Sequence, residues 1–292
     1  MGKQTENFTP DELMVVCMAR QIKDGEVVAQ GLATPMVAAA YLLARHTHAP
    51  NLYFASAIGQ GICYEPAPLG LLRVESLWLD RALTTSGFVR AVCDVLPRLR
   101  PKEFFRPAQV DAYGNFNNIA FGHDIHHPRL RLPGTGGIPD VTTFLSDIYL
   151  YVPRHSRLTF VPKLDFLSGL GHHPARKQGE GPRYLISDLG QFDFVEDRPD
   201  GEEPTALRRM RLITYHPGVA ISHIQAKTGF PLLIAPEVTE TPPPTLEELQ
   251  LLREEIDPLG IRRLELLSGA ERRMLLHQII TQEKSAGNYG MT

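Results

Sequence analysis

This chain of 292 residues has few cysteines, little excess of one charge sign and no long uninterrupted apolar run. Its three cysteines show no paired spacing, which argues against a disulfide framework and predicts reduced thiols in a cytoplasmic protein. The net charge is −3 and the basic residues are scattered, so no nucleic-acid surface is expected. The longest apolar stretch, residues 27–44, is interrupted by polar residues, a glycine and a proline, so no membrane span is expected.

Two common catalytic motifs are also absent. The sequence contains neither a GxSxG nucleophile elbow nor a Walker phosphate loop. These absences argue against a serine hydrolase of the elbow type and against a P-loop nucleotide hydrolase. The bulk composition, with 43% hydrophobic and 22% charged residues, is that of an ordinary globular protein with ample material for a core.

The first sixty residues predict a helix followed by a strand–helix–strand unit. Thr9, Pro10 and Glu12 are typical of a helix start, and Gly25 of a helix stop. A valine-rich strand, a helix and a second strand then follow with short connections, at residues 26–32, 36–48 and 52–58. Such an arrangement implies parallel strands covered by helices.

The remainder of the chain continues this α/β pattern. Strands are expected at residues 104–111, 148–153, 157–162, 164–169, 183–194 and 209–215, and helices at 86–99, 218–230 and 245–256. We therefore predict an open, mainly parallel α/β sheet flanked by helices, forming one domain over residues 1–258. Residues 259–292 are expected to form a helical tail that packs against a surface or a partner.

The second predicted strand ends on small residues, at the point where an α/β enzyme usually places its chemistry. Ala55, Ser56 and Ala57 offer no group stronger than one hydroxyl. Ser56 is either a nucleophile or a small residue selected for close packing, and the sequence places no base beside it. Glu65 follows a few residues later, either turning back toward the strand end or lying in solvent.

The loop from Asp111 to Asp140 is rich in glycine, histidine and asparagine. Its segment Gly134, Thr135, Gly136 and Gly137 either forms a tight structural turn or offers backbone N–H groups to an anionic oxygen. The same loop carries His123, His126 and His127 in an HxxHH pattern. Gly122 and Pro128 oppose a helix there, so polar loop residues are expected rather than a metal site.

Several motifs, taken in order, resemble those of the class I CoA-transferase family, specifically the B (β) subunit of glutaconate CoA-transferase and its relatives. They are "YGNFN" at 113–117, "HHPRLRLPGTGG" at 126–137 and "EEIDP" at 254–258, within a resemblance that spans about residues 8–258. The resemblance implies the fold just predicted, an A-type partner subunit in an α2β2 or larger heteromer, and a coenzyme A thioester as substrate. No permanently bound cofactor, metal, nucleic acid or membrane is expected.

The resemblance also implies roles for particular residues. Gly134–Gly137 would lie against the thioester, with Asn115 and Asn117 supporting the neighbouring loop. Transferase-type β subunits carry a nucleophilic glutamate at the end of the second strand. Here that position falls on Ala57, or on Ala55 if one residue is skipped, and neither is a carboxylate.

Three functional hypotheses follow from this departure. The first is a β-type subunit of a heteromeric enzyme that decarboxylates a CoA ester or hydrolyses one of its carbon–carbon bonds, as non-transferase branches of the family do. The second is a true CoA-transferase whose carboxylate comes from Glu65 or from the partner. The third is a catalytically silent subunit that stabilises an active partner.

Overall fold

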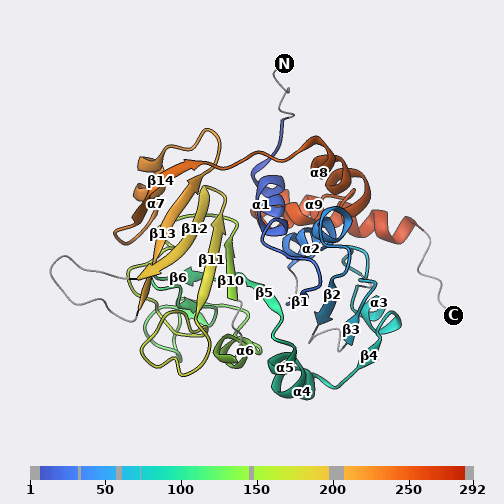
Figure 1. Ribbon diagram of the computed structural model, residues 1–292, viewed down its shortest axis with the longest axis horizontal. Helices are drawn as coiled ribbons and strands as arrows, with labels where there is room; N and C mark the ends of the chain where they lie inside the picture. Colours follow the sequence, from blue (N-terminus) through green and yellow to red (C-terminus); the bar gives the residue numbers. More distant parts are fainter. Residues whose placement is uncertain are drawn as a thin grey trace. The chain divides into compact units, whose positions relative to one another are not determined.

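The computed structural model describes residues 7–31, 34–56, 61–72, 74–144, 148–196 and 207–286. These residues form two compact units (Figure 1). The first unit combines residues up to 91 with residues from 243 onward, and the second comprises residues 92–242. The second unit is therefore inserted into the sequence of the first. No helix in the described part of the chain is long and apolar enough to cross a membrane.

The strands of the first unit follow the order β1-β2-β3-β4, namely Val27–Gln30, Tyr53–Ser56, Gly61–Cys63 and Thr84–Thr85. β1 and β2 are parallel, and the next two pairings are antiparallel. Its helical segments are α1 (Pro10–Ala19), α2 (Pro35–Thr47), α3 (Val74–Asp80), α4 (Phe88–Arg90), α8 (Leu246–Gln250), the π-helix η2 (Leu251–Ile256), the 3-10 helix η3 (Ile261–Glu265) and α9 (Gly269–Ser285).

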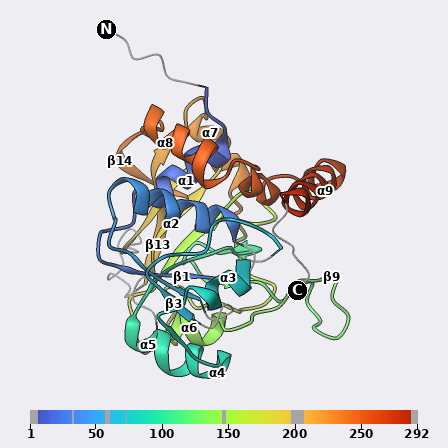
Figure 2. The same cartoon turned by 90° about the vertical axis from the view of Figure 1, so that its right-hand side faces the viewer.

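Helix α2 is buried along most of its length because it packs against α1, η2 and η3 as well as β1. Its apolar surface therefore extends around more than one side. Helix α9 is the long red helix in Figure 2. Its Ile279 packs in one buried cluster with Ile261 and Leu264 of η3. Glu283 fixes its far end by accepting hydrogen bonds from the N–H groups of Leu71 and Leu72, at 2.9 and 3.0 Å. The predicted C-terminal helix thus packs on its own unit.

The strands of the second unit follow the order β14-β13-β12-β11-β10-β5. The segment from β5 (Lys102–Phe105) through β10 (Ile148–Val152) to β11 (Pro182–Ser187) is parallel. β12 (Gly190–Glu196) is antiparallel to both β11 and β13 (Arg208–Tyr215), and β14 (Leu233–Glu240) runs parallel to β13. The prediction of an open α/β sheet with parallel strands, flanking helices and a C-terminal helix is confirmed.

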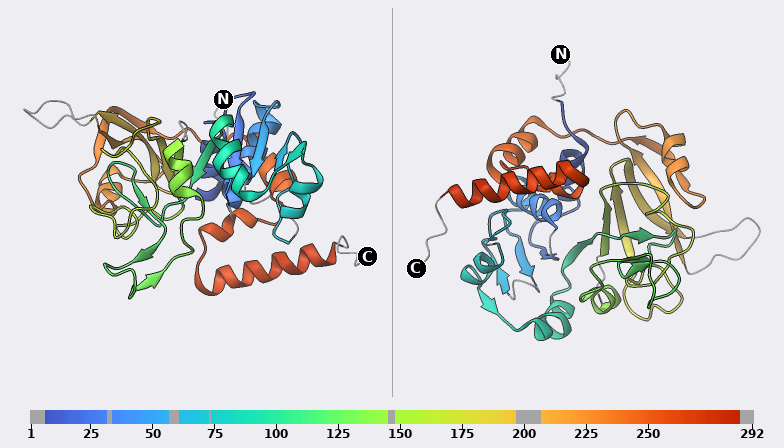
Figure 3. Two further views of the ribbon diagram at one scale, coloured as in Figure 1. Left: turned by 90° about the horizontal axis from the view of Figure 1, so that it is seen from below. Right: turned by 180° about the vertical axis from the view of Figure 1, so that it is seen from behind.

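Short elements complete the second unit. The antiparallel pairs are β6 (Gln109–Val110) with β7 (Phe116–Asn117), and β8 (Ala120–Phe121) with β9 (Leu130–Arg131). Figure 3 shows the β8–β9 hairpin projecting away from the strands of its own unit. The helical segments are η1 (Ala91–Val95), α5 (Leu96–Leu99), α6 (Ile138–Phe144) and α7 (Ile221–Lys227).

Two strand predictions were wrong. Residues 157–162 and 164–169 form turns and bends, and each pairs with the β6–β7 strands through one isolated bridge, Val110 to Phe160 and Phe116 to Gly169. Phe160 is fully buried, so these segments carry apolar residues for packing rather than for a ladder. Sequence reasoning also did not identify β14, an edge strand whose internal Pro236 and mostly exposed residues hide the usual pattern.

A buried cation joins the two sequence segments of the first unit. Arg262 in η3 is 5% exposed and faces three carboxylates. It donates hydrogen bonds to Glu12 at 3.0 Å and to Asp257 at 2.9 Å. Its Nε lies 2.8 Å from Asp11 Oδ2, within ion-pair distance but without hydrogen-bond alignment. Arg253 adds a further hydrogen bond to Glu12 at 2.7 Å.

We predict that Arg262→Met destabilises the chain by about 3–5 kcal/mol, because it leaves buried carboxylates without their cation. The control is Arg20→Met, which removes the more exposed pair of Arg20 with Glu248, whose side chains are 31% and 15% exposed. That variant should lose about 1 kcal/mol or less. Urea denaturation measures both values, and equal losses in the two variants would contradict the assigned importance of Arg262.

Three histidines are buried in the second unit. Burial lowers the pKa of His155 to about 3 and the pKa values of His172 and His216 to about 4. His216 Nε2 lies 2.8 Å from the carbonyl oxygen of Ser187, an acceptor, so this nitrogen carries the proton. These rings are held neutral inside the folded unit, whereas in the unfolded chain they become protonated near pH 6.5.

Replacing His216 should therefore weaken the acid destabilisation of the protein. As pH falls from about 6.5 toward 4, unfolded His216 takes up a proton that the native ring does not, which costs up to about 1.4 kcal/mol per pH unit. Burial raises the pKa of Glu103 to about 8 and that of Asp188 to about 6, and both oppose this trend. The quantity to compare is therefore the difference in pH dependence of stability between a variant and the wild type.

Between pH 4 and 6.5, the free energy of unfolding should depend less steeply on pH in His216→Gln than in the wild type. The two slopes should differ by at most the value for one bound proton, about 1.4 kcal/mol per pH unit. His127→Gln serves as the control because His127 is exposed. Identical slopes in all three proteins would show that His216 does not link folding to protonation.

Candidate functional site

The end of β2 is buried and carries no carboxylate in the described residues. Ala55 is 1% exposed and Ser56 is 6% exposed, and they pair with Ile62 and Gly61 of β3. Ala57, the other position expected for the family's glutamate, lies outside the described residues. Ser56 makes an interaction within the protein and is embedded in the strand ladder.

Glu65 lies beyond the far end of β3. The ladder pairs Ser56 with Gly61 and Phe54 with Cys63, so β3 runs back along β2 toward its beginning. Glu65 is exposed and follows β3 by two residues, which carries it away from Ser56. The alternative in which Glu65 turns back to the end of β2 does not fit this ladder.

The glycine segment Gly134–Gly137 lies in the second unit, between β9 and α6. Gly134 and Gly136 adopt φ values of +103° and +51°, which a residue with a side chain adopts only with strain. A Cβ atom at either position would meet nothing within 4 Å, so the backbone borders open space. Gly137 is different, because a Cβ there would lie 3.3 Å from Val92.

The amide groups of this segment differ in availability. The N–H of Gly134 donates to the carbonyl of Asn118 at 3.1 Å and is already used. Within the described residues, the N–H groups of Thr135, Gly136 and Gly137 make no hydrogen bond. Three adjacent donors beside open space can bind an oxygen that carries negative charge.

Asn115 and Asn117 are buried and bonded to the protein. Asn117 is 0% exposed, and its side chain donates to Gln109 and Ala120, each at 2.8 Å, while accepting from the N–H of Ile119 at 2.9 Å. Asn115 donates to Asp111 at 3.0 Å and accepts from the N–H of Gly171 at 2.8 Å. Both side chains therefore hold neighbouring loops in place.

Thr142 in α6 and Arg176 connect these loops to the helix that follows the glycine segment. The Thr142 hydroxyl donates to the carbonyl of Ile138 at 2.8 Å and accepts from the N–H of Leu170 at 3.1 Å. Arg176 donates to the carbonyls of Thr142, Leu170 and Gly171. Sequence reasoning missed both residues, since a threonine and an arginine outside any motif give no signal of such contacts.

The HxxHH residues lie on the exposed β8–β9 hairpin. Asp124 accepts from the N–H of His126 at 2.8 Å, and its other carboxylate oxygen lies 3.0 Å from His127 Nδ1. The described residues contain no group of three or more histidine, cysteine or acidic side chains suited to a metal ion. The histidines serve here as turn residues of a polar hairpin.

Comparison with known proteins identifies the relatives of this chain. No protein-family model matches it. It is 31% identical over 268 residues to the B subunit of 3-oxoadipate CoA-transferase from Pseudomonas knackmussii, covering 84% of this chain and 92% of that protein. It is 30% identical over 269 residues to the B subunit of glutaconate CoA-transferase from Acidaminococcus fermentans, covering 86% and 94%.

Relatives with other activities match as well. The IpdB component of the cholesterol ring-cleaving hydrolase from Rhodococcus jostii is 29% identical over 245 residues, covering 82% of this chain and 88% of that protein. Among solved structures, a chain of the decarboxylase AibA/AibB superposes with a TM-score of 0.72 at 31% identity, covering 88% of this chain and 98% of that one. The resemblance drawn from the sequence motifs is thus confirmed: the chain belongs to the family of CoA-transferase β subunits and their decarboxylase and hydrolase relatives.

Proposed function

We propose that this chain is the β-type subunit of a heteromeric enzyme that decarboxylates an acyl-CoA or hydrolyses one of its carbon–carbon bonds. The observation that carries the proposal is the end of β2, where Ala55, Ser56 and Ala57 supply no carboxylate. A relative solved as the two-component decarboxylase AibA/AibB supports both the reaction class and an A-type partner. The IpdB relative supports ring-opening hydrolysis as the other form.

Neither reaction requires a covalent nucleophile on this chain. Both require a group that stabilises negative charge, which the glycine segment can provide. When a carbon–carbon bond of an acyl-CoA breaks, its electron pair moves toward the thioester carbonyl, whose oxygen becomes negative. The free N–H groups of Thr135, Gly136 and Gly137 are donors of the kind that stabilises such an oxygen. The coenzyme A thioester is the substrate in this proposal, and the partner supplies the acid–base groups.

CoA transfer is the second candidate, favoured by the two transferase relatives. It requires a nucleophile that accepts and releases an acyl group, and here only the partner subunit would provide that carboxylate. Loss of a covalent nucleophile costs on the order of 10⁶ in rate in a protease example, so transfer with this chain's own residues is disfavoured.

Co-purification of the chain with its A-type partner tests these alternatives. Incubation with a panel of acyl-CoA thioesters should consume one of them, releasing carbon dioxide or a carbon–carbon hydrolysis product, with no dependence on an added acceptor acid. Mass spectrometry after borohydride or hydroxylamine treatment should find no modified glutamate. A trapped glutamate would establish transfer instead, and full activity of the partner alone would make this chain a structural subunit.

Thr142→Val should lower kcat about tenfold, because loss of its hydroxyl bonds disturbs α6 and the donors that precede it, and a shift of about 1.4 kcal/mol corresponds to that factor. KM should change less than twofold, and Thr142→Ser should restore kcat. The control Thr143→Val removes a similar hydrogen bond, from Thr143 to the carbonyl of Pro139, without touching the neighbouring loop. Equal effects of the two valine variants would contradict this positioning role.

A further inference from the structure

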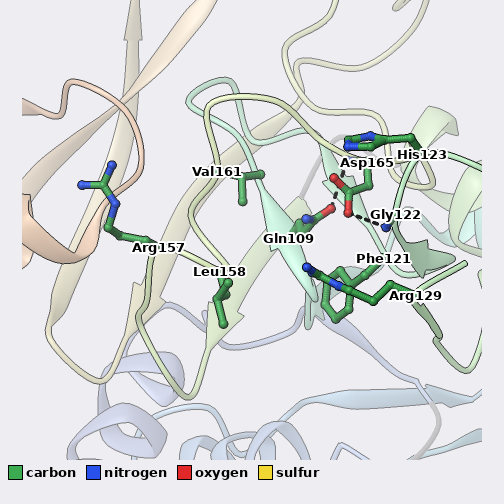
Figure 4. Close-up of a pocket in the computed structure, with 9 residues that line it drawn as sticks. All are labelled: Gln109, Phe121, Gly122, His123, Arg129, Arg157, Leu158, Val161 and Asp165. Carbon is green, nitrogen blue, oxygen red and sulfur yellow. Dashed lines mark hydrogen bonds between the residues drawn. The ribbon is translucent and has the colours of Figure 1, made fainter.

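A cavity of about 330 Å³ lies within the second unit, beside the β8–β9 hairpin (Figure 4). Its walls combine Gln109, Phe121 and Arg129 with Leu158, Val161 and Asp165. This volume is near the lower end of the range, about 300–1000 Å³, that small-molecule sites occupy in proteins. None of these residues belongs to the glycine segment, and nothing in the proposed function uses them.

Gln109 presents hydrogen-bond donors to this cavity. The side chain is 5% exposed, and its Oε1 accepts from Asn117 Nδ2 at 2.8 Å and from the N–H of Asp165 at 3.1 Å. Because both partners are donors, the orientation of the amide is fixed, and its NH₂ group faces away from them. That NH₂ group has no acceptor among the residues that the structure describes.

Arg129 supplies a positive charge at the same place. Its guanidinium lies over the Phe121 ring, 5.9 Å from the centroid. Figure 4 shows the Arg129 side chain extending toward Gln109, whereas the Arg157 side chain extends away from the other labelled residues. A guanidinium and a primary amide together suit a carboxylate, which accepts several hydrogen bonds.

The other walls restrict the charge and shape of the ligand. Asp165 carries one negative charge, and its Oδ2 accepts from the N–H of Gly122 at 2.8 Å. Asp165 offsets the charge of Arg129, and Arg157 at the cavity's edge extends away from both, which favours a single negative charge over a dianion such as phosphate. Leu158 and Val161 add hydrocarbon surface to the walls of the cavity.

We propose that this cavity binds a small monocarboxylate, whose oxygens accept hydrogen bonds from Gln109 and Arg129 and whose hydrocarbon part lies against Leu158 and Val161. The site does not include the glycine segment, and its binding does not depend on the proposed acyl-CoA chemistry. It would allow the protein to respond to free carboxylic acids.

Titration calorimetry of the full chain with hexanoate tests the proposal. Saturable binding at one site per chain is expected, and inorganic phosphate and hexanol should each bind at least tenfold more weakly. Arg129→Met should weaken hexanoate binding about ten- to a hundredfold, the loss expected for a charge-assisted hydrogen bond. Gln109→Glu keeps the acceptor for Asn117 and Asp165 but removes the donors, and should weaken binding at least as much.

Arg157→Met is the matched control, because it removes the same charge from the cavity's edge and should change affinity less than twofold. Arg129 is exposed, so its replacement keeps the test valid if Gln109→Glu fails to fold. Absence of hexanoate binding, equal binding of hexanol, or equal losses in Arg157→Met and Arg129→Met would each overturn the proposal.

Discussion

The first unit depends on one buried cation. Arg262 satisfies carboxylates from α1 and from the turn after η2, and it does so where water is excluded. Without it, Asp11, Glu12 and Asp257 would leave negative charge inside the protein, which is far more costly than the loss of one contact. The same segment delivers Glu265 to the start of α2, where it accepts the N–H of Met36 at 2.9 Å. The helices that cover β1 and β2 are therefore held by residues from the far end of the chain.

The loops of the second unit are held differently, by buried amide and hydroxyl side chains together with Arg176. Asn115, Asn117 and Thr142 each use most of their bonding capacity on groups of neighbouring segments. This network holds α6 and leaves the amides of the glycine segment unused. A site of this kind is preorganised, because its donors do not have to reorient when negative charge develops. In the proposed function, these donors and the lack of a carboxylate at the end of β2 together let a CoA-transferase scaffold support chemistry other than transfer.

The sequence predicted those helices and strands whose ends and apolar pattern are set by residues close together in the chain. The helix expected at 245–256 begins where Thr245 and Glu248 form reciprocal hydrogen bonds at 2.7 and 3.1 Å. The strands Val27–Gln30 and Tyr53–Ser56 lie where their apolar runs place them. Contacts between distant residues were not predictable, since nothing near Arg262 in the sequence reveals that it meets carboxylates of α1. Phe160 misled the strand assignment because burial in a turn produces the same apolar pattern as a ladder. Gln109 belongs to no motif and Arg129 lies in the 126–137 motif without a role of its own, so both donors became visible only as walls of one cavity.

The insertion of the second unit into the first has a consequence for synthesis on the ribosome. Glu12 and its partner Arg262 are separated by 250 positions, so at roughly 5–20 residues per second the carboxylate emerges tens of seconds before its cation. Throughout that interval α1 and α2 lack the segments that cover them, and the apolar surface of α2 is available to other molecules. The second unit, which is continuous in sequence from residue 92 to residue 242, is free to fold during this wait. The first unit, although it starts earlier in the sequence, is consequently completed after the second.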